Sequence, residues 1–369
     1  MTKIKSFIKK EIVFSIALLL ALVSAFIVKP SKEYIYYIDF RTLGLLLALM
    51  LVVQGLSSCG LFDYLVKKLM SKIKNRRQLA FMLTSLCFFT SMLITNDVAL
   101  ITFVPFTVML LDYIDDKQYS VYLIVLETVA ANLGSMFTPI GNPQNLYLFS
   151  VSGISIGSFL SLMLPYTLTA FVLLIIAIAI IKPKTIENTP ISNSKDLKTS
   201  HLIVYIILFA LCICTVLSLL DYRVMLGIVI VVMAVVNIKL IPKADYILLL
   251  TFIAFFIFIG NMKNIPDVSQ FLGKMVLGRE CYVSIGASQI VSNVPAAMLL
   301  SGFTTNYKEL IIGTNLGGLG TLIASMASLI SFKFYNKTKA SNTIEYMLTF
   351  TLVNILFLIV LTVEYILIG

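Results

Sequence analysis

The sequence predicts an all-α polytopic membrane protein whose two halves form an inverted repeat. Of its 369 residues, 59% are hydrophobic and 12% are charged, and the mean hydropathy is +0.99. Soluble domains are usually about 45–50% apolar and about 25% charged, so an ordinary soluble domain is excluded. The pattern N-L-G-x-x-x-T-x-I begins at Asn132 and again at Asn315. Each copy follows an Asn-centred turn between apolar segments, which indicates a repeated pair of broken helices.

Long apolar runs predict nine membrane crossings, because a helix needs about 20 mostly apolar residues to span a bilayer. They lie near residues 12–29, 40–59, 119–137, 157–181, 201–220, 224–238, 245–261, 309–332 and 343–368. The first run is kept as a transmembrane helix, since Lys29-Pro30 follows it without the small-residue cleavage pattern of a signal peptide. We therefore expect a multi-pass protein of the cell (inner or plasma) membrane.

Two further apolar segments, 79–111 and 281–303, carry turns centred on Asn96 and Asn293. Irregular backbone at membrane depth survives only where protein buries it, so both segments are predicted to be re-entrant hairpins. With the N-terminus in the cytoplasm, most of the 28 Lys and Arg residues then lie in cytoplasmic segments, Lys184, Lys243 and Lys333 among them, whereas Lys274 lies outside. The bias is weaker if each hairpin is a single crossing, so the positive-inside rule favours the hairpins.

The repeat divides the chain into two halves and a linker. Residues 1–181 form the first repeat, and residues 182–200 are a polar cytoplasmic linker. Residues 201–369 form the second repeat, and no separate soluble domain is expected. The first repeat contains the hairpin 79–111 and a broken helix at 119–145; the second contains the hairpin 281–303 and a broken helix at 309–332. The two series begin an odd number of crossings apart, so they enter the membrane in opposite directions.

The helix breaks are the segments predicted to bind ligands. Backbone carbonyls freed by a break can coordinate Na⁺, and the positive N-termini of half-helices suit an anionic substrate. Asn145 is among the residues expected to supply side-chain oxygens. The predicted cation ligands are Thr95, Asn96, Asp97, Asn132, Gly134, Ser292, Asn293, Asn315 and Gly317. The predicted substrate contacts are Asn96, Asp97, Thr138, Asn142, Asn293 and Thr321. The alternative is that the small residues only allow close helix packing.

Two carboxylates inside apolar segments are the candidates for proton coupling. Asp97 follows the first Asn turn, and Glu127 lies five residues before Asn132. A carboxylate at membrane depth is costly and by default marks an ion or proton pathway. Asp97 could instead be an acidic residue in a helix's first turn. Glu127 could instead form an interhelical hydrogen bond.

Several other classes of function find no support in the sequence. The net charge of +10 comes from basic residues lying between apolar spans, which does not suggest nucleic-acid binding. The five cysteines form no C-x-x-C pair, so they indicate neither a metal cluster nor a disulfide framework. No H-E-x-x-H, G-x-S-x-G or phosphate-binding loop is present, so no catalytic residue and no covalent cofactor is expected.

Four segments carry a resemblance to a known family. They are TNDVALITFVP at 95–105, NLGSMFTPIGNPQN at 132–145, SQIVSNVPAAMLL at 288–300 and NLGGLGTLIAS at 315–325. The chain resembles the citrate-transporter-like permeases of the ion transporter superfamily over nearly its whole length. Divalent anion:sodium symporters, arsenite permeases and a sodium/proton antiporter branch belong to that superfamily. The resemblance implies an elevator-type homodimer, in which a transport domain carrying both hairpins and both broken helices moves against a scaffold domain.

The hairpin tips also show a departure from the carboxylate symporters. In those proteins each tip bears Ser-Asn-Thr, whereas this chain has Thr95-Asn96-Asp97 and Ser292-Asn293-Val294. An ionised Asp97 would repel a dicarboxylate unless a cation or a proton neutralised it. The first tip therefore looks more like that of the arsenite permeases and the antiporters.

We expect an ion-coupled secondary active transporter, driven by Na⁺ or H⁺, that moves a small anion by alternating access. Its partners would be the bilayer and a carboxylate, such as citrate or a dicarboxylate, or an oxyanion. An arsenite efflux permease and a Na⁺/H⁺ antiporter are the alternatives of the same fold. An intramembrane enzyme would need an acid/base or metal constellation, and none is visible. A passive channel is disfavoured because hairpin tips entering from opposite sides suit alternating access.

Overall fold

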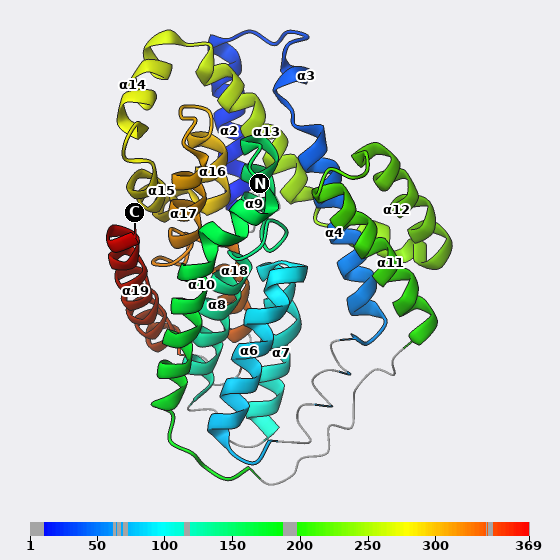
Figure 1. Ribbon diagram of the computed structural model, residues 1–369, viewed down its shortest axis with the longest axis vertical. Coiled ribbons are helices and arrows are strands. Elements are labelled where there is room, and N and C mark those ends of the chain that lie inside the picture. The colour runs from blue at the N-terminus through cyan, green and yellow to red at the C-terminus, as the bar shows by residue number, and fades with distance from the viewer. Residues whose placement is uncertain are drawn as a thin grey trace, which may run out of the picture.

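The computed structural model describes residues 11–61, 64, 68, 73–113, 119–186, 198–336, 338 and 342–368. Every regular element in these residues is helical, apart from an isolated bridge between Asn75 and Thr185. Seven helices there are long and apolar enough to cross a membrane (Figure 1). They are α4 (Phe40–Ser58), α6 (Arg76–Ile94), α10 (Ile156–Ala179), α11 (Thr199–Val216), α12 with η2 (Tyr222–Lys243), α13 (Tyr246–Lys263) and α19 (Thr343–Ile368). The predicted all-α polytopic class is confirmed.

Six of these seven helices coincide with predicted crossings, and the seventh, α6, was predicted to be the first arm of a hairpin. Because α6 has 19 residues, its length alone would let it cross a membrane. The predicted crossings at 12–29 and 119–137 are shorter apolar helices, α2 (Ile12–Ile27) and α8 (Ser120–Ser135). The re-entrant topology of the hairpins therefore stays a prediction.

The two halves contain the same series of elements. In the first half, α6 is followed by α7 (Asn96–Tyr113), α8, α9 (Pro143–Ser152) and α10. In the second half the series is α15 (Glu280–Val291), α16 (Asn293–Leu300), α17 (Tyr307–Leu316), α18 (Met326–Tyr335) and α19. In each series a single residue separates the first two helices, and the third and fourth helices are separated by an irregular segment.

The irregular segments lie where the sequence predicts helix breaks, but the elements after them are longer than expected. The first broken helix was expected to end at 145, whereas α9 continues to Ser152. It ends there because Gly153 takes a left-handed conformation, with φ of 67°, that suits glycine. α9 begins with Asn142, whose side chain accepts a hydrogen bond from the Asn145 amide, and with Pro143 at its first position.

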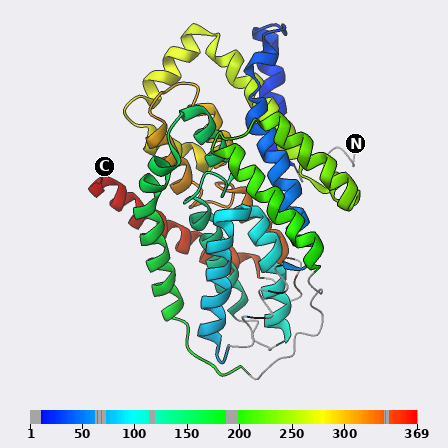
Figure 2. The ribbon, with the colours of Figure 1, turned by 45° about the vertical axis from the view of Figure 1, so that its right-hand side comes forward.

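Both views show α6 and α7 side by side, with their connecting tip directed toward the middle of the molecule (Figures 1 and 2). Their free ends lie at the same end of the protein as the end of α10, and α14 (Pro266–Val276) lies at the opposite end. Of the predicted linker 182–200, residues 187–197 lie outside the described residues. Its first part is tied to α6, since the Arg76 amide donates to Lys184 O and the Ile186 amide donates to Lys74 O.

Side-chain exposure along the helices fits a protein surrounded by lipid. On α19, Leu348, Leu352 and Leu367 are 67–79% exposed, whereas Tyr346 and Phe350 on the same helix are fully buried. Such an apolar exterior would be unfavourable in water and is favourable in a hydrocarbon bilayer.

Candidate functional site

The tips of the two helix pairs have the same unusual backbone. Thr95, between α6 and α7, has φ of 75° and ψ of 149°. Ser292, between α15 and α16, has φ of 76° and ψ of 154°. A positive φ is strained for residues other than glycine, and such strain gathers at functional sites. Because two separate tips share the same strained backbone conformation, this conformation is part of the fold at both places.

Each tip is bonded to the helix break of its own half. The backbone amide of Asn96 donates to Gly141 O at 3.1 Å, and that of Asn293 donates to Ala324 O at 2.9 Å. Gly141 and Ala324 occupy the same place in the repeat, because each lies nine residues after the Asn that begins its motif. The amide left free at the start of each half-helix is thereby satisfied by a carbonyl of the break.

Asn132, the Asn of the first motif, connects the first tip to the second half. Its Oδ1 accepts from Asn96 Nδ2 at 3.1 Å and from Ser325 Oγ at 3.0 Å. Its Nδ2 donates to Ser328 Oγ at 3.3 Å. All four residues are buried, and Ser325 and Ser328 belong to the cap and first turn of α18. A polar group in an apolar interior needs such partners, so Asn132 joins three segments at one point.

Asn315, the Asn of the second motif, makes the matching contacts with the first half. Its Oδ1 accepts from Asn142 Nδ2 at 3.1 Å, and its Nδ2 donates to Asn145 Oδ1 at 2.6 Å. Each motif Asn thus binds the residues ten and thirteen positions after the other motif Asn. We call these residues, Asn96, Asn132, Asn142, Asn145, Asn315, Ser325 and Ser328, the reciprocal network.

The carbonyls freed in each break are bound by a side-chain amide. In the first break, Asn145 Nδ2 donates to the carbonyls of Ser135, Met136 and Thr138 at 3.4, 3.2 and 3.2 Å. In this structure the Asn145 side chain is bonded within the protein, and its oxygen as a ligand stays a prediction. Carbonyls can only accept hydrogen bonds, so its nitrogen must face them. Its Oδ1 is occupied by Asn315.

Gln289 does the same in the second break, and the sequence did not single it out. Its Nε2 donates to Gly317 O at 3.0 Å and to Leu319 O at 2.9 Å, while its Oε1 accepts from the Thr321 amide at 2.9 Å. The available signal was a glutamine in a predicted hairpin arm, directly after Ser288. The two threonines predicted to touch substrate also bind backbone here: the Thr138 hydroxyl donates to Met92 O, and the Thr321 hydroxyl to Gln289 O.

Two glycines predicted as cation ligands lie at close helix contacts. A Cβ on Gly134 would collide with Phe88 O and approach Ser91 Oγ to 2.6 Å. A Cβ on Gly317 would approach Ser288 Oγ to 2.6 Å. The packing role, which was the alternative for these small residues, is therefore present at both positions. Their carbonyls as cation ligands stay a prediction.

A cavity of about 600 Å³ adjoins the first tip. Thr95, Asp97 and Asn142 line it, and so do Lys243 and Lys333, both predicted to be cytoplasmic. Its other charged lining residues are Glu11 and Asp245. Asn96, Asn132, Asn293 and Asn315 are at most 5% exposed and are not among its lining residues. These four asparagines, all predicted to bind the cation, are therefore buried and do not face this cavity.

The two candidate proton-coupling residues have different surroundings. Asp97 is half-buried in the first turn of α7, facing the cavity. Glu127 is fully buried in α8, where its Oε1 accepts from Thr107 Oγ1 of α7 at 2.5 Å. Its Oε2 has no hydrogen-bond partner among the described residues. Glu127 thus makes the interhelical bond given as its alternative role, and only Asp97 faces the cavity.

No group of three or more His, Cys, Asp or Glu side chains that could hold a metal ion occurs among the described residues. A Na⁺ site of the predicted kind would instead use neutral oxygens with at most one carboxylate. Asp97 and the oxygens of Thr95 and Asn142 are the ligand types that face the cavity at the tip. Gln54 also lines this cavity, and its Oε1 is buried without a partner among the described residues.

Comparison with known proteins gives one family over most of the chain. A family model described as a citrate transporter matches residues 6–308. An uncharacterized transporter of Methanocaldococcus jannaschii is 33% identical over 326 residues, covering 87% of this chain and 88% of that protein. The inner membrane protein YbiR of Escherichia coli is 31% identical over 324 residues, covering 85% and 84%. A silicon efflux transporter of Oryza sativa subsp. japonica is 36% identical over 130 residues, covering 35% and 26%.

Proposed function

The chain belongs to the citrate transporter family, and from this premise we propose that it is an ion-coupled secondary transporter that moves a small anion by alternating access. The family model is described as a citrate transporter, and two of the three relatives named above are transporters by name. The observation that carries the proposal is the reciprocal network, in which the broken helices of the two halves bind each other beside the hairpin tips. Secondary transporters place their substrate and ion sites at this meeting point of discontinuous helices.

The coupling ion in this proposal is Na⁺ or H⁺ held at the first tip. Asp97 supplies a carboxylate, Thr95 and Asn142 supply neutral oxygens, and all three face one cavity. A bound cation or proton neutralises Asp97 and so removes its repulsion of an anion. Lys243 and Lys333, farther along the same cavity, provide positive charge for the entering anion. Substrate would therefore bind only after the ion, which is the condition for coupled movement.

Alternating access in this proposal is the movement of two groups of helices against each other. α2 packs on α13, and α4 packs on α11 and α12. The hairpin helices pack on the broken helices, α6 on α8 and α15 on α17. The first group is suited to be the scaffold of a homodimer and the second to be the moving domain. Because the cavity reaches Lys243 and Lys333, we assign this conformation to the cytoplasm-open state, with the N-terminus in the cytoplasm.

The second candidate function has two forms of the same fold. One is an efflux transporter for an oxyacid such as arsenite, and the other is a Na⁺/H⁺ antiporter. Asp97 favours it, because the carboxylate symporters carry a threonine where this chain has an acidic residue. One relative is named a silicon efflux transporter, although it matches only 35% of this chain. An oxyacid that carries little charge would not be repelled by a carboxylate.

A ligand screen distinguishes these functions. Purified protein would be heated with citrate, succinate, sulfate or arsenite, each in Na⁺ and in choline buffer. A ligand that binds only the folded state at 100 times its Kd stabilises by about 2.7 kcal/mol. We expect one anion to raise the Tm by several degrees, and more in Na⁺ or at lower pH than in choline at neutral pH. Stabilisation by Na⁺ or by arsenite alone would favour the second candidate. No response to any anion or to Na⁺ would contradict the proposed function.

A further inference from the structure

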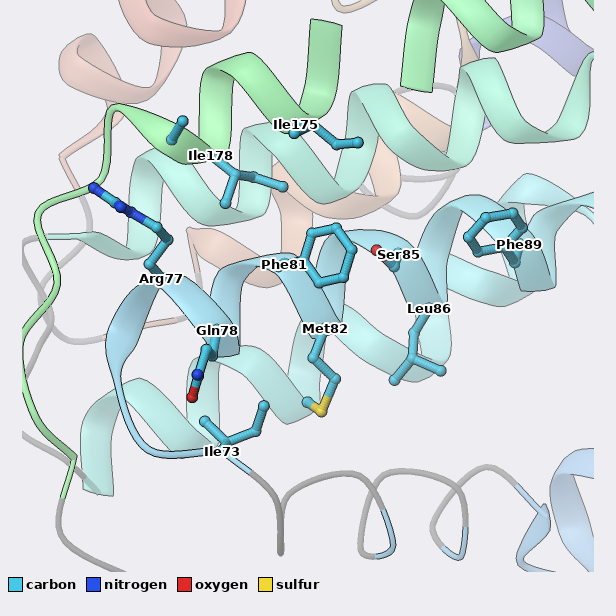
Figure 3. Close-up of a pocket in the computed structure, with 11 residues that line it drawn as sticks. Ile73, Arg77, Gln78, Phe81, Met82, Ser85, Leu86, Phe89, Ile175 and Ile178 are labelled. Atoms are coloured by element: carbon cyan, nitrogen blue, oxygen red, sulfur yellow. The ribbon is translucent and has the colours of Figure 1, made fainter. Parts of the chain in front are cut away.

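A second concave surface lies away from the reciprocal network, on the outside of α6 and α10 (Figure 3). This groove has a volume of about 660 Å³. It runs along α6 from Arg77 to Phe89, which at 1.5 Å per residue is about 18 Å. Ile175 and Ile178 of α10 form its other wall, and Phe81 points between the two helices (Figure 3). It contains neither a tip residue nor a residue of the reciprocal network.

Apart from Ser85, the lining of the groove is apolar except at one end. Phe81 and Phe89 are 44% and 50% exposed, so large aromatic faces are presented outward. Arg77 and Gln78 both lie at the end where α6 begins, and Arg77 points toward the α10 side (Figure 3). A narrow apolar channel with a polar end matches the shape and chemistry of a lipid, which has a hydrocarbon chain and a charged headgroup.

The polar end of the groove is surrounded by exposed cations. Lys74, Arg77, Lys182 and Lys184 are all exposed. The bonds from the Arg76 amide to Lys184 O and from the Ile186 amide to Lys74 O hold the two basic segments side by side. The stretches 73–79 and 180–186 contain no Asp or Glu. Positive charge is therefore concentrated in those two stretches.

Arg77 is fixed in place at this end. Its Nε donates to Ile181 O at 2.9 Å, which holds the side chain across the gap between α6 and the end of α10. The remaining guanidinium donors belong to an exposed residue and can bind a phosphate in the bidentate manner. Basic pockets between transmembrane helices on the cytoplasmic side are typical binding places for anionic headgroups.

We propose that this groove binds one anionic phospholipid, with an acyl chain along Phe81 and Phe89 and its phosphate at Arg77 and the neighbouring lysines. The occupant is a lipid of the surrounding bilayer because the groove lies on a helix face long and apolar enough to span a membrane. The cations select an anionic lipid over a zwitterionic one. The site lies on α6, the helix that leads to the first tip at Thr95, so a bound lipid would sit on the hairpin itself.

The test is native mass spectrometry of the delipidated full chain mixed with equal amounts of phosphatidylglycerol and phosphatidylcholine. The wild type should retain phosphatidylglycerol preferentially. Arg77→Gln and Lys184→Gln should each lower that preference about fivefold, the effect of one surface charge. Lys274→Gln, an exposed lysine on α14 at the opposite end, is the matched control and should leave it unchanged.

Two groove variants separate a bound chain from simple surface attraction. Ser85→Trp fills the groove, and Phe81→Ser removes the aromatic face at its centre without adding bulk. Both should lower retention of phosphatidylglycerol and phosphatidylcholine alike. Wild-type retention in both would show that the cations attract headgroups without a seated chain, and the proposal would be wrong. It would also be wrong if Arg77→Gln and Lys274→Gln had equal effects.

Discussion

Asp97→Asn is expected to abolish gradient-driven accumulation of substrate while leaving substrate binding measurable. The substitution keeps the size and shape of the side chain in the first turn of α7 but removes its charge and its ability to titrate. If Asp97 holds the coupling cation or proton, the variant has nothing to exchange with the gradient. Without the carboxylate, an anion should bind at least as tightly as in the wild type, because the repulsion is gone.

The measurement uses proteoliposomes and the anion that stabilises the protein in the ligand screen. Accumulation under an imposed Na⁺ or H⁺ gradient should fall at least tenfold, whereas counterflow exchange, which needs only a substrate gradient and no ion gradient, should continue. Asp245→Asn is the comparison variant, since Asp245 faces the same cavity from α13. Asparagine caps a helix as well as aspartate does, so α13 should be intact.

Equal loss in both variants would mean that the charge of the cavity, not Asp97, determines coupling. Wild-type coupling in Asp97→Asn would reduce Asp97 to a residue of the helix start and make Glu127 the next candidate.

Asn132→Ala and Asn315→Ala are both expected to abolish transport and to lower the Tm. Each substitution removes every side-chain hydrogen bond that one motif Asn makes to the opposite half. The groups left behind are buried, and each unsatisfied one costs about 1–3 kcal/mol. The helix breaks would lose their common anchor, so the ligand groups of the tips would no longer be held together.

The control for this pair is Asn264→Ala, since Asn264 is exposed and donates its Nδ2 to Tyr37 OH at 2.7 Å. Thermal unfolding and transport should both stay near wild-type values in the control. Because the two motif asparagines bind equivalent positions in the opposite half, both variants should show the loss. A normal transport rate in Asn132→Ala, with the protein folded, would remove the reciprocal network from the mechanism.

The sequence was sufficient to predict where the irregular segments lie. The helix breaks followed from glycine and proline in apolar runs, and the tips at Thr95 and Ser292 followed from asparagine turns at the same depth in two apolar segments. Single prolines are tolerated inside helices, as Pro105 in α7 and Pro165 in α10 show, so it was the clustering of such residues that marked the breaks.

The partners of those segments could not be predicted from the sequence. Asn132 meets Ser325 and Ser328 because two halves of the chain pack together, and no local pattern specifies that pairing. The amide of Asn145 turned out to serve the freed carbonyls in its own half. Gln289 was overlooked because a glutamine in an apolar helix is not distinctive until the facing backbone is known. The length of α9 depended on Gly153, which the repeat does not mark.

Alternating access means that one site is reached from each side of the membrane in turn. The most direct test of this is the accessibility of a cysteine placed at Val98. Val98 lines the cavity next to Asp97, and it is half-buried. Of the native cysteines only Cys214 is not buried, so a Cys214→Ser background is suitable. Cysteines at Lys184 and Lys274 serve as references for the predicted cytoplasmic and outer surfaces. With an impermeant thiol reagent, we expect Val98→Cys to react from both sides, in proportions that shift with the imposed ion gradient. Reaction from one side only under every gradient would contradict alternating access.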